Sequence, residues 1–319
     1  MTDTLTLRRS TVETLEAAGL DPDYVRDVVT RALDEDLAGG TDATTVATVP
    51  IGRTGTADLV ARAGGVVAGL PVAAAVFDIA GRTTAEALAG DAAGDAAGGA
   101  AVRVEPVAAD AQRVRPGDVL LTVCGPTRAV LTAERTALNL LCHLSGVATL
   151  TRAWVDALAG TAARVRDTRK TTPGLRALEK YAVRCGGGEN HRMGLADAAL
   201  VKDNHVVAAG GVLPAFAAVR QAFPDLPVQV ECDSLEEVAA VLAAGADLLL
   251  LDNMTNTDLR RAVELARPRR ARLEASGGLT LDRALEVGQT GVDYLAVGAL
   301  THSAPALDIG LDLRERDTA

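Results

Sequence analysis

The sequence predicts an α/β fold, with a mixed N-terminal part followed by an open, incomplete TIM-like α/β barrel. Beyond Thr132, short apolar runs alternate with amphipathic helical patterns, which is typical of parallel βαβ units. About six such units are visible where a closed barrel has eight, so an open barrel is favoured. The chain of 319 residues is long enough for one large domain or two modest ones. A doubly wound sheet remains the alternative architecture.

The core has to be built from small side chains. Hydrophobic residues make up 48% of the chain, but only 2% of the residues are aromatic. Ala, Val and Leu must therefore fill the interior, which favours helices packed closely on a sheet.

The N-terminal part is expected to begin with two helices. Ser10 and Glu13 have the spacing of a capping box, which predicts a short helix that ends at Gly19. The pair Asp21-Pro22 then begins a second helix that runs to about Leu37.

Strands and a loop are expected next. Residues 56–61 and 119–123 are apolar runs of strand length. Residues 91–101 are rich in Ala and Gly without a hydrophobic period, which predicts a surface loop or insertion. A long helical pattern then begins at Thr132.

The barrel strands are predicted from six apolar runs, at residues 163–165, 198–201, 228–230, 248–251, 272–273 and 294–297. Helices are expected between the later runs, beginning at Ser234, Thr257 and Thr280.

Charge and composition exclude several classes of protein. A net charge of −10 argues against a nucleic-acid or membrane-surface binder, which would carry a basic face. The longest uncharged apolar stretch, residues 63–77, is too short to span a bilayer, and no signal segment begins the chain. The four cysteines stand far apart without a C-x-x-C pair, so neither a zinc site nor a disulfide framework is indicated. We expect a soluble protein of the reducing cytoplasm.

Polar residues or glycines follow every predicted barrel strand. In a parallel barrel the carboxyl ends of the strands form the active-site rim, so these groups are expected to meet. They are Asp167 to Thr172, Lys202 to His205, Glu231, Asp252-Asn253, Glu274 with Ser276-Gly277-Gly278, and Gly298.

The charges at this rim divide by role. Arg169, Lys170, His191, Arg192 and Lys202 form a predicted cationic floor for carboxylates and phosphates. Cys185, which lies close by in sequence, is expected to be inert, because no base partner stands near it.

The carboxylates and glycines are the other two parts of the predicted site. Glu231 and Asp252 could hold Mg²⁺ with substrate oxygens, or act as ion-pair partners for the nearby cations. The glycine turns at Gly277 and Gly298 favour a phosphate site, although Gly-Gly is also an ordinary turn.

Several stretches resemble the quinolinate phosphoribosyltransferases, the carboxylating nicotinate-nucleotide pyrophosphorylases. The resemblance rests on residues 134–141, 144–149, 167–176, 178–183, 190–192, 202–205, 230–232, 251–254, 274–278 and 297–302. Residues 65–77 also resemble the N-terminal sheet of that family. Two departures are Cys142 and His143, which stand where many members carry Gln and Arg, and residues 91–101, which look longer than usual.

The resemblance implies a two-domain subunit. An α/β sandwich would comprise residues 1–133 joined by 304–319, and an open barrel residues 134–303. It also implies a homodimer, or a higher oligomer built from it, in which Arg135 reaches the partner's site.

The resemblance further implies transfer of phosphoribosyl from phosphoribosyl pyrophosphate to quinolinate, with decarboxylation to nicotinate mononucleotide. Lys170, Glu231 and Asp252 would be catalytic, and the two carboxylates would hold Mg²⁺. The implied substrate-binding residues are Arg135, Thr168, Arg169, Lys170, His191, Arg192, Lys202, Ser276, Gly277, Gly298 and His302.

Three alternatives stay open. A paralogous phosphoribosyltransferase could use another acceptor on the same scaffold. Lys202 at a strand end could form a Schiff base in a lyase. A binding protein for phosphate ligands is disfavoured by so many convergent charges.

Overall fold

The computed structural model describes residues 7–91 and 102–314, and the chain divides into two compact units. Unit 1 comprises Met1–Thr149, Ala177–Cys185 and Ala304–Ala319. Unit 2 comprises Leu150–Arg176 and Gly186–Ser303. The boundary expected after residue 133 falls inside a continuous helix, α5 (Thr127–Ala157), which begins earlier than Thr132.

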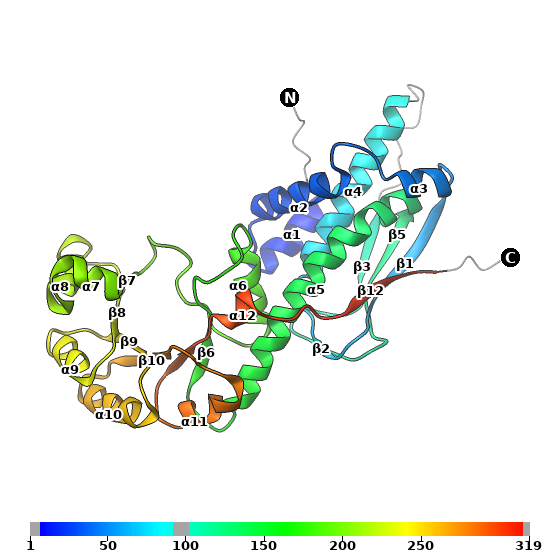
Figure 1. Cartoon of the computed structure of the whole chain (residues 1–319). Helices are drawn as coiled ribbons and strands as arrows, with labels where there is room; N and C mark the ends of the chain where they lie inside the picture. The colour runs from blue at the N-terminus through cyan, green and yellow to red at the C-terminus, as the bar shows by residue number, and fades with distance from the viewer. Residues whose placement is uncertain (1–6, 92–101, 315–319) are drawn as a thin grey trace. The chain divides into compact units, whose positions relative to one another are not determined.

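Unit 1 combines an antiparallel sheet with helices (Figure 1). In the described residues the sheet has the strand order β12-β1-β5-β3, and β2 and β4 form a separate pair. Its strands are β1 (Thr54–Ala61), β2 (Gly65–Val66), β3 (Arg103–Pro106), β4 (Arg113–Val114), β5 (Val119–Pro126) and β12 (Ile309–Leu313). Its helices are α1 (Arg9–Ala17), α2 (Pro22–Leu37), α3 (Ala43–Thr48), α4 (Leu70–Asp91), the first part of α5, and α6 (Arg176–Cys185) from Ala177 onward.

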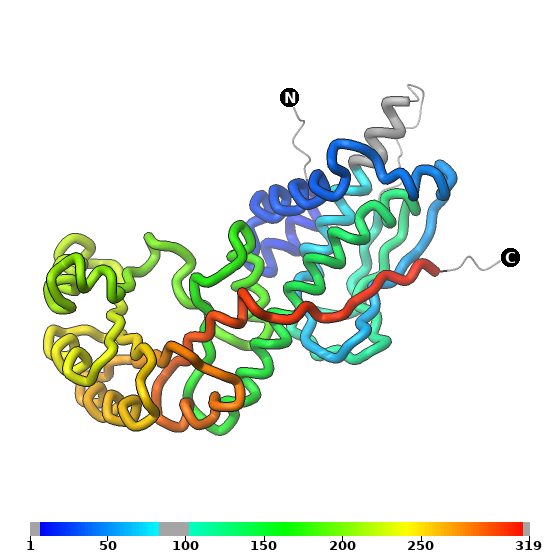
Figure 2. The backbone as a smooth tube through the Cα atoms, in the orientation of Figure 1, coloured from blue at the N-terminus to red at the C-terminus, as the bar shows by residue number. Residues whose placement is uncertain are grey.

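The unit 1 core forms where α4 packs against β3 and β5, and α1 and α2 pack on α4. Phe77 and Ile79 of α4 are fully buried there, with Leu59 and Leu121 of the sheet. Figure 2 shows the chain returning at its C-terminal end to run beside β1, where Ala57 pairs with Leu313.

Helix starts in unit 1 partly match the sequence prediction. Asp21 caps α2 as expected, because its carboxylate accepts the Asp23 N–H. The capping box predicted at Ser10 is wrong, since Ser10 lies inside α1 and Arg8 occupies the cap position.

The expected sheet at residues 65–77 is also corrected. Only Gly65–Val66 is strand, and α4 begins at Leu70. The carboxylate of Asp110 accepts the N–H groups of Gly69 and Leu70, at 2.9 and 3.1 Å, and so satisfies the first turn of this helix. Asp91 ends α4, and the remainder of the predicted loop, residues 92–101, lies outside the described residues.

Unit 2 is an open β/α barrel. Its described strands form one parallel sheet in the order β6-β11-β10-β9-β8-β7, in which β6 and β7 are the two edges. The strands are β6 (Arg164–Arg166), β7 (Ala199–Val201), β8 (Val228–Cys232), β9 (Leu248–Asp252), β10 (Arg272–Ser276) and β11 (Tyr294–Ala296). Each coincides with a predicted apolar run, so the parallel, incomplete barrel is confirmed.

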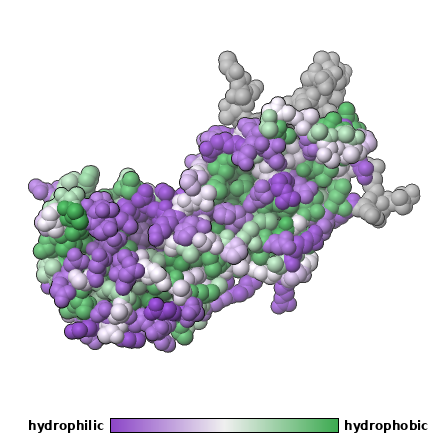
Figure 3. Space-filling model, in the orientation of Figure 1, coloured by the Kyte–Doolittle hydropathy of each residue, from purple (hydrophilic) through white to green (hydrophobic). Residues whose placement is uncertain are grey.

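Helices lie between these strands and, for α12, after the last of them. They are α7 (Asp203–Ala209), α8 (Val212–Ala222), α9 (Leu235–Ala243), α10 (Asn256–Ala266), α11 (Ala284–Gly288) and α12 (Ala299–His302), with 3-10 turns η1 (Arg267–Arg269) and η2 (Leu281–Arg283). Ser234 caps α9 as predicted, whereas Thr255 rather than Thr257 caps α10. Apolar patches lie among polar surface at the end of unit 2 that carries α7 and α8 (Figure 3), and Val207 and Phe223 are exposed in this part of the chain.

Candidate active site

A cavity of about 540 Å³ lies at the carboxyl ends of the unit 2 strands. It brings together nearly all the residues predicted for the site: Thr168, Arg169, Lys170, His191, Arg192, Lys202, Glu231, Asp252, Ser276, Gly277, Gly298 and His302. Leu250, Glu274 and Ala296 also line it. The described residues that line the cavity do not include Arg135, which lies on α5 in unit 1.

The parallel sheet explains why these side chains meet. Adjacent strands run in the same direction, so their last residues share one edge. The register places Asp252 at the end of β9 opposite Ser276 at the end of β10. Glu231 of β8 lies opposite Leu250 of β9.

Two carboxylates, Glu231 and Asp252, share one part of the cavity. Burial raises the pKa of Glu231, nearby Lys202 opposes that rise, and the charge of Asp252 adds to it. The Lys202 Nζ lies 3.6 Å from a carboxylate oxygen of Glu231. The ion-pair role that the sequence left open for Glu231 is therefore present.

Asn253 holds the second carboxylate. Its side-chain amide donates to an Asp252 oxygen at 2.6 Å, and its backbone N–H donates to the Ser276 carbonyl at 2.9 Å. Asn253 has a left-handed backbone with φ 53°, a conformation that asparagine tolerates better than most residues. The direction of Asp252 is thereby fixed from the neighbouring position.

The two carboxylates fit a magnesium ion as a partial ligand set. Carboxylate oxygens are the donors that Mg²⁺ prefers, and the ion commonly completes its shell with waters and substrate phosphates. Residues 7–91 and 102–314 contain no group of three or more His, Cys, Asp or Glu side chains placed to hold a metal. A cation held by Glu231 and Asp252 would thus depend on substrate oxygens.

The cations lie close enough to affect one another. Burial lowers the pKa of Arg192, and the positive charge of Arg169 lowers it further. The Arg192 Nη1 donates to the Ala198 carbonyl at 2.9 Å, which anchors the guanidinium. The loop that carries Lys170 is fixed by two hydrogen bonds, from Lys170 N–H to Thr168 Oγ1 at 3.0 Å and from Thr301 Oγ1 to the Lys170 carbonyl at 2.7 Å. Positive charge is therefore concentrated in the cavity of an acidic protein.

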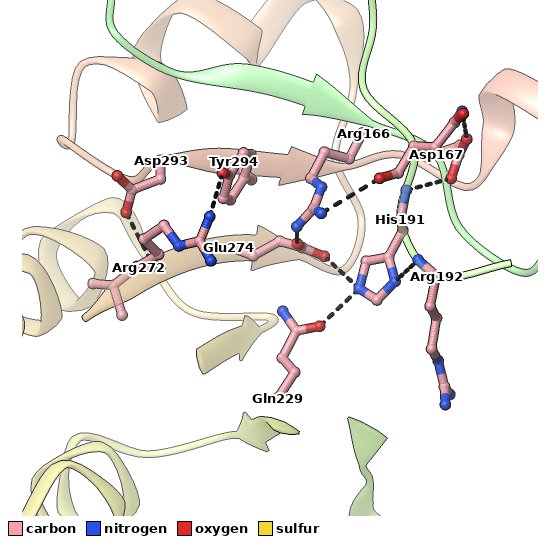
Figure 4. Close-up of polar contacts among 11 residues, drawn as sticks. Arg166, Asp167, His191, Arg192, Gln229, Arg272, Glu274, Asp293 and Tyr294 are labelled. Atoms are coloured by element: carbon pink, nitrogen blue, oxygen red, sulfur yellow. Dashed lines mark hydrogen bonds and ion pairs between the residues drawn. The ribbon is translucent and has the colours of Figure 1, made fainter. Parts of the chain in front are cut away.

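A buried polar network supports His191 (Figure 4). The ring Nδ1 accepts the Arg192 backbone N–H at 2.7 Å, and Nε2 lies 2.7 Å from Gln229 Oε1. An acceptor at Nδ1 places the proton of a neutral ring on Nε2, so Nε2 donates to Gln229. A carboxylate oxygen of Glu274 lies 3.5 Å from the same nitrogen.

These contacts hold the His191 ring within the protein. Its expected contribution to the cationic floor stays a prediction. His191 lines the cavity as expected, but both its nitrogens are used within the protein.

The network extends away from the cavity. Glu274 is fully buried and pairs with Arg166 Nη1 at 2.9 Å, and the Arg166 guanidinium stacks 4.2 Å over the ring of Tyr294. Burial raises the pKa of Glu274, while Arg166 and Gln229 oppose that rise. Sequence reasoning missed Gln229, although a polar residue inside an apolar strand is a usable signal.

The glycine turns leave room for neighbouring side chains. A Cβ on Gly277 would lie 2.2 Å from Asn253 Oδ1, and the φ of 87° is one that side-chain-bearing residues rarely adopt. A Cβ on Gly298 would lie 2.9 Å from Lys170 Cδ and 3.2 Å from His302 Nε2. Glycine at both positions therefore avoids clashes with Asn253, Lys170 and His302.

A thiol nucleophile is not supported. Burial, followed by the charge of Asp110, raises the pKa of Cys185 to about 11, and burial raises that of Cys232 to about 12. Both thiols stay protonated near neutral pH, so Cys185 is inert as predicted.

In the described part of the chain, no helix has the length and apolar character needed to cross a membrane.

Comparison with protein families gives two matches that together cover most of the chain. Residues 42–145 match the family described as quinolinate phosphoribosyl transferase, N-terminal domain. Residues 147–312 match the corresponding C-terminal domain.

Individual relatives agree. A protein named nicotinate-nucleotide pyrophosphorylase (carboxylating) from Mycobacterium leprae is 53% identical over 293 residues, covering 91% of this chain and 98% of that protein. A chloroplastic relative of the same name from Arabidopsis thaliana is 38% identical over 92% of this chain and 84% of its own length. The crystal structure of NadC from Streptococcus pyogenes is 38% identical, with a TM-score of 0.82 over 93% of this chain and 99% of that chain.

Proposed function

The chain belongs to the quinolinate phosphoribosyltransferase family, and we propose that its unit 2 cavity is where quinolinate and phosphoribosyl pyrophosphate react. The protein is a pentosyltransferase of NAD biosynthesis. It transfers phosphoribosyl to the pyridine nitrogen and releases pyrophosphate, and loss of the adjacent carboxylate as CO₂ gives nicotinate mononucleotide. The observation that supports this site best is the meeting of cations, a carboxylate pair and glycine turns around one cavity.

The cations hold the acceptor. Quinolinate carries two adjacent carboxylates, and Arg169, Lys170, Arg192 and Lys202 offer charge-assisted hydrogen bonds to them. A monocarboxylate would leave part of this cationic set unpaired in a cavity that is partly shielded from water, which supplies selectivity. The pyridine nitrogen is already nucleophilic, so no general base is required.

The carboxylates face the sugar. As the bond to pyrophosphate breaks, positive charge develops at the anomeric carbon, and Glu231 and Asp252 stabilise it electrostatically. Lys170 stabilises the negative charge that builds on the leaving group. Mg²⁺, held by Glu231 and Asp252, would neutralise pyrophosphate as it departs.

The sugar phosphate binds at the glycine turns. Ser276, Gly277 and Gly298 offer backbone N–H groups, and Ser276 and His302 add side-chain donors. Thr168, in the loop before Lys170, completes the set of polar contacts. Decarboxylation follows because the quaternised ring nitrogen accepts the electrons that the leaving carboxylate releases.

We further propose that the working enzyme is a homodimer in which Arg135 completes the partner's site. A mixing experiment tests this, because neither Arg135→Ala nor Lys170→Ala protein should be active alone. If Arg135 acts across the interface, exchange of subunits restores about a quarter of wild-type activity, since half the dimers then contain one intact site. No recovery after verified subunit exchange would contradict the shared site.

We also propose a cytoplasmic location, which cell fractionation tests.

Turnover tests the function directly. The purified protein is incubated with quinolinate, phosphoribosyl pyrophosphate and Mg²⁺, and nicotinate mononucleotide is measured. Nicotinate is the control acceptor, because it has one carboxylate fewer. Equal use of nicotinate, or no product from quinolinate, would overturn the assignment of the acceptor.

A further inference from the structure

Gln229 breaks the apolar pattern of the strand that carries it. It lies in β8 between Val228 and Val230, and it is only 2% exposed. Strands of a parallel sheet covered on both faces are usually apolar throughout. Burying an amide in such a strand disfavours folding unless its hydrogen bonds are made.

The amide of Gln229 is only half satisfied. Its Oε1 accepts from His191, whereas its Nε2 makes no hydrogen bond of normal geometry among the described residues, although its interaction with the Glu274 carboxylate opposes the rise that burial causes in the pKa of that group. A buried donor without a well-formed hydrogen bond lowers stability. Stability alone therefore does not account for a glutamine at position 229. Its contact with His191 points to a role in the site instead.

The contact fixes the imidazole from both sides. Gln229 holds Nε2 at 2.7 Å, and Nδ1 accepts the Arg192 backbone N–H at 2.7 Å (Figure 4). The carboxylate of Glu274, itself held by Arg166, lies 3.5 Å from the same Nε2 and adds a second acceptor. The ring cannot rotate without losing these contacts, so the start of the Arg192 backbone is held with it.

We propose that Gln229 is a positioning residue for the acceptor, which acts through His191 on Arg192 and does not touch the substrate. Gln229 is absent from the described residues that line the cavity, whereas His191 and Arg192 line it. Arg192 is anchored at two points, the backbone N–H by His191 and Nη1 by Ala198. The remaining donors of the guanidinium are thereby directed for the carboxylates of quinolinate. This inference rests on the proposed function, in which Arg192 binds the acceptor.

Gln229→Leu is the informative change, because leucine fills a similar volume without an amide. We expect KM for quinolinate to rise about tenfold, the scale of one lost hydrogen bond, with KM for the ribosyl donor unchanged. The melting temperature should not fall strongly, because the amide makes only one hydrogen bond of normal geometry. Gln289→Leu is the matched control, since Gln289 is exposed at the end of α11 and does not line the cavity.

A double-mutant cycle tests the route through His191. His191→Ala should raise KM for quinolinate by itself, and Gln229→Leu in that background should add less than about twofold. Effects on KM that multiply would show that Gln229 acts independently of His191 and would overturn the proposal. An unchanged KM, a large fall in melting temperature, or a Gln229→Leu chain that fails to fold would overturn it too. A wild-type protein that does not convert quinolinate would instead refute the proposed function.

Discussion

Gly146→Ala should destabilise unit 1, although glycine to alanine inside a helix normally stabilises. Gly146 lies within α5, where alanine is favoured over glycine by about 1 kcal/mol. A Cβ there would lie 2.1 Å from the Pro305 carbonyl oxygen and 3.0 Å from Ala306 Cα. Both neighbours are backbone atoms of a segment tied to the helix by the bond from Leu307 N–H to the Cys142 carbonyl, so neither can turn aside.

The clash outweighs the helix propensity. Overpacking that forces backbone to shift costs about 1–3 kcal/mol, and a contact this short belongs at the upper end. Subtracting the propensity gain leaves a net loss of about 2 kcal/mol, which corresponds to a fall in Tm of about 4–8 °C for a domain of this size.

Differential scanning calorimetry measures the effect, with Gly81→Ala as the control. Gly81 also lies inside a helix, α4, but its added Cβ would lie 3.0 Å from Val102 Cγ2 and 3.3 Å from the Val102 backbone nitrogen, much less close than the 2.1 Å contact at Gly146. Shifts of a few tenths of an ångström relieve such contacts, so the control should stay within about 1 kcal/mol of wild type. If Gly146→Ala melts no lower than Gly81→Ala, the close backbone approach does not determine stability here.

Three further outcomes are expected. Lys170→Ala and Arg192→Ala should each abolish turnover without lowering the melting temperature, because both side chains line the cavity. Near-normal activity of either purified variant would show that the substituted residue does not belong to the site. Chelation of divalent metal should abolish turnover, and added Mg²⁺ should restore it, since Glu231 and Asp252 supply only part of a ligand shell. Full activity in excess chelator would contradict the proposal that Mg²⁺ is required. Burial raises the pKa of Asp110 above its usual value, so the folded state binds this proton more tightly than the unfolded chain. The free energy of unfolding of the wild type should therefore rise relative to that of Asp110→Asn as the pH falls toward about 4. Urea unfolding at several pH values measures this difference, and a difference that does not change with pH would contradict the prediction.

The barrel and its rim could be predicted because one rule connects sequence to position. Each apolar run ends in a polar residue or glycine, and parallel strands carry all such ends to the same edge. Glu231, Asp252 and Gly277 therefore meet in the structure as the sequence indicated.

The contacts behind the rim could not be predicted in the same way. Whether Gln229 faces His191 or a helix depends on how the pleat of β8 is oriented, which a single apolar run does not specify. The role of His191 also depends on which ring nitrogen the Arg192 N–H approaches, a matter of local backbone path.

At the N-terminal end, local sequence patterns gave the wrong element boundaries. Ser10 and Glu13 have capping-box spacing, yet α1 starts one residue before Ser10. Residues 65–77 are expected to be sheet from their resemblance to the family, whereas Asp110, distant in sequence, supplies the cap that starts α4. Long-range partners of this kind are invisible to pattern reading.

The pairing of β1 with β12 sets an order for folding during synthesis. β1 is made early, but the neighbour on one of its sides, Ile309–Leu313, is the last strand described. All the strands of the unit 2 sheet precede Val297, so that sheet can form while β1 still exposes an unpaired edge. Exposed edges are templates for wrong pairing between chains. Until Ile309–Leu313 has been made, this edge of β1 therefore stays open to pairing with another chain.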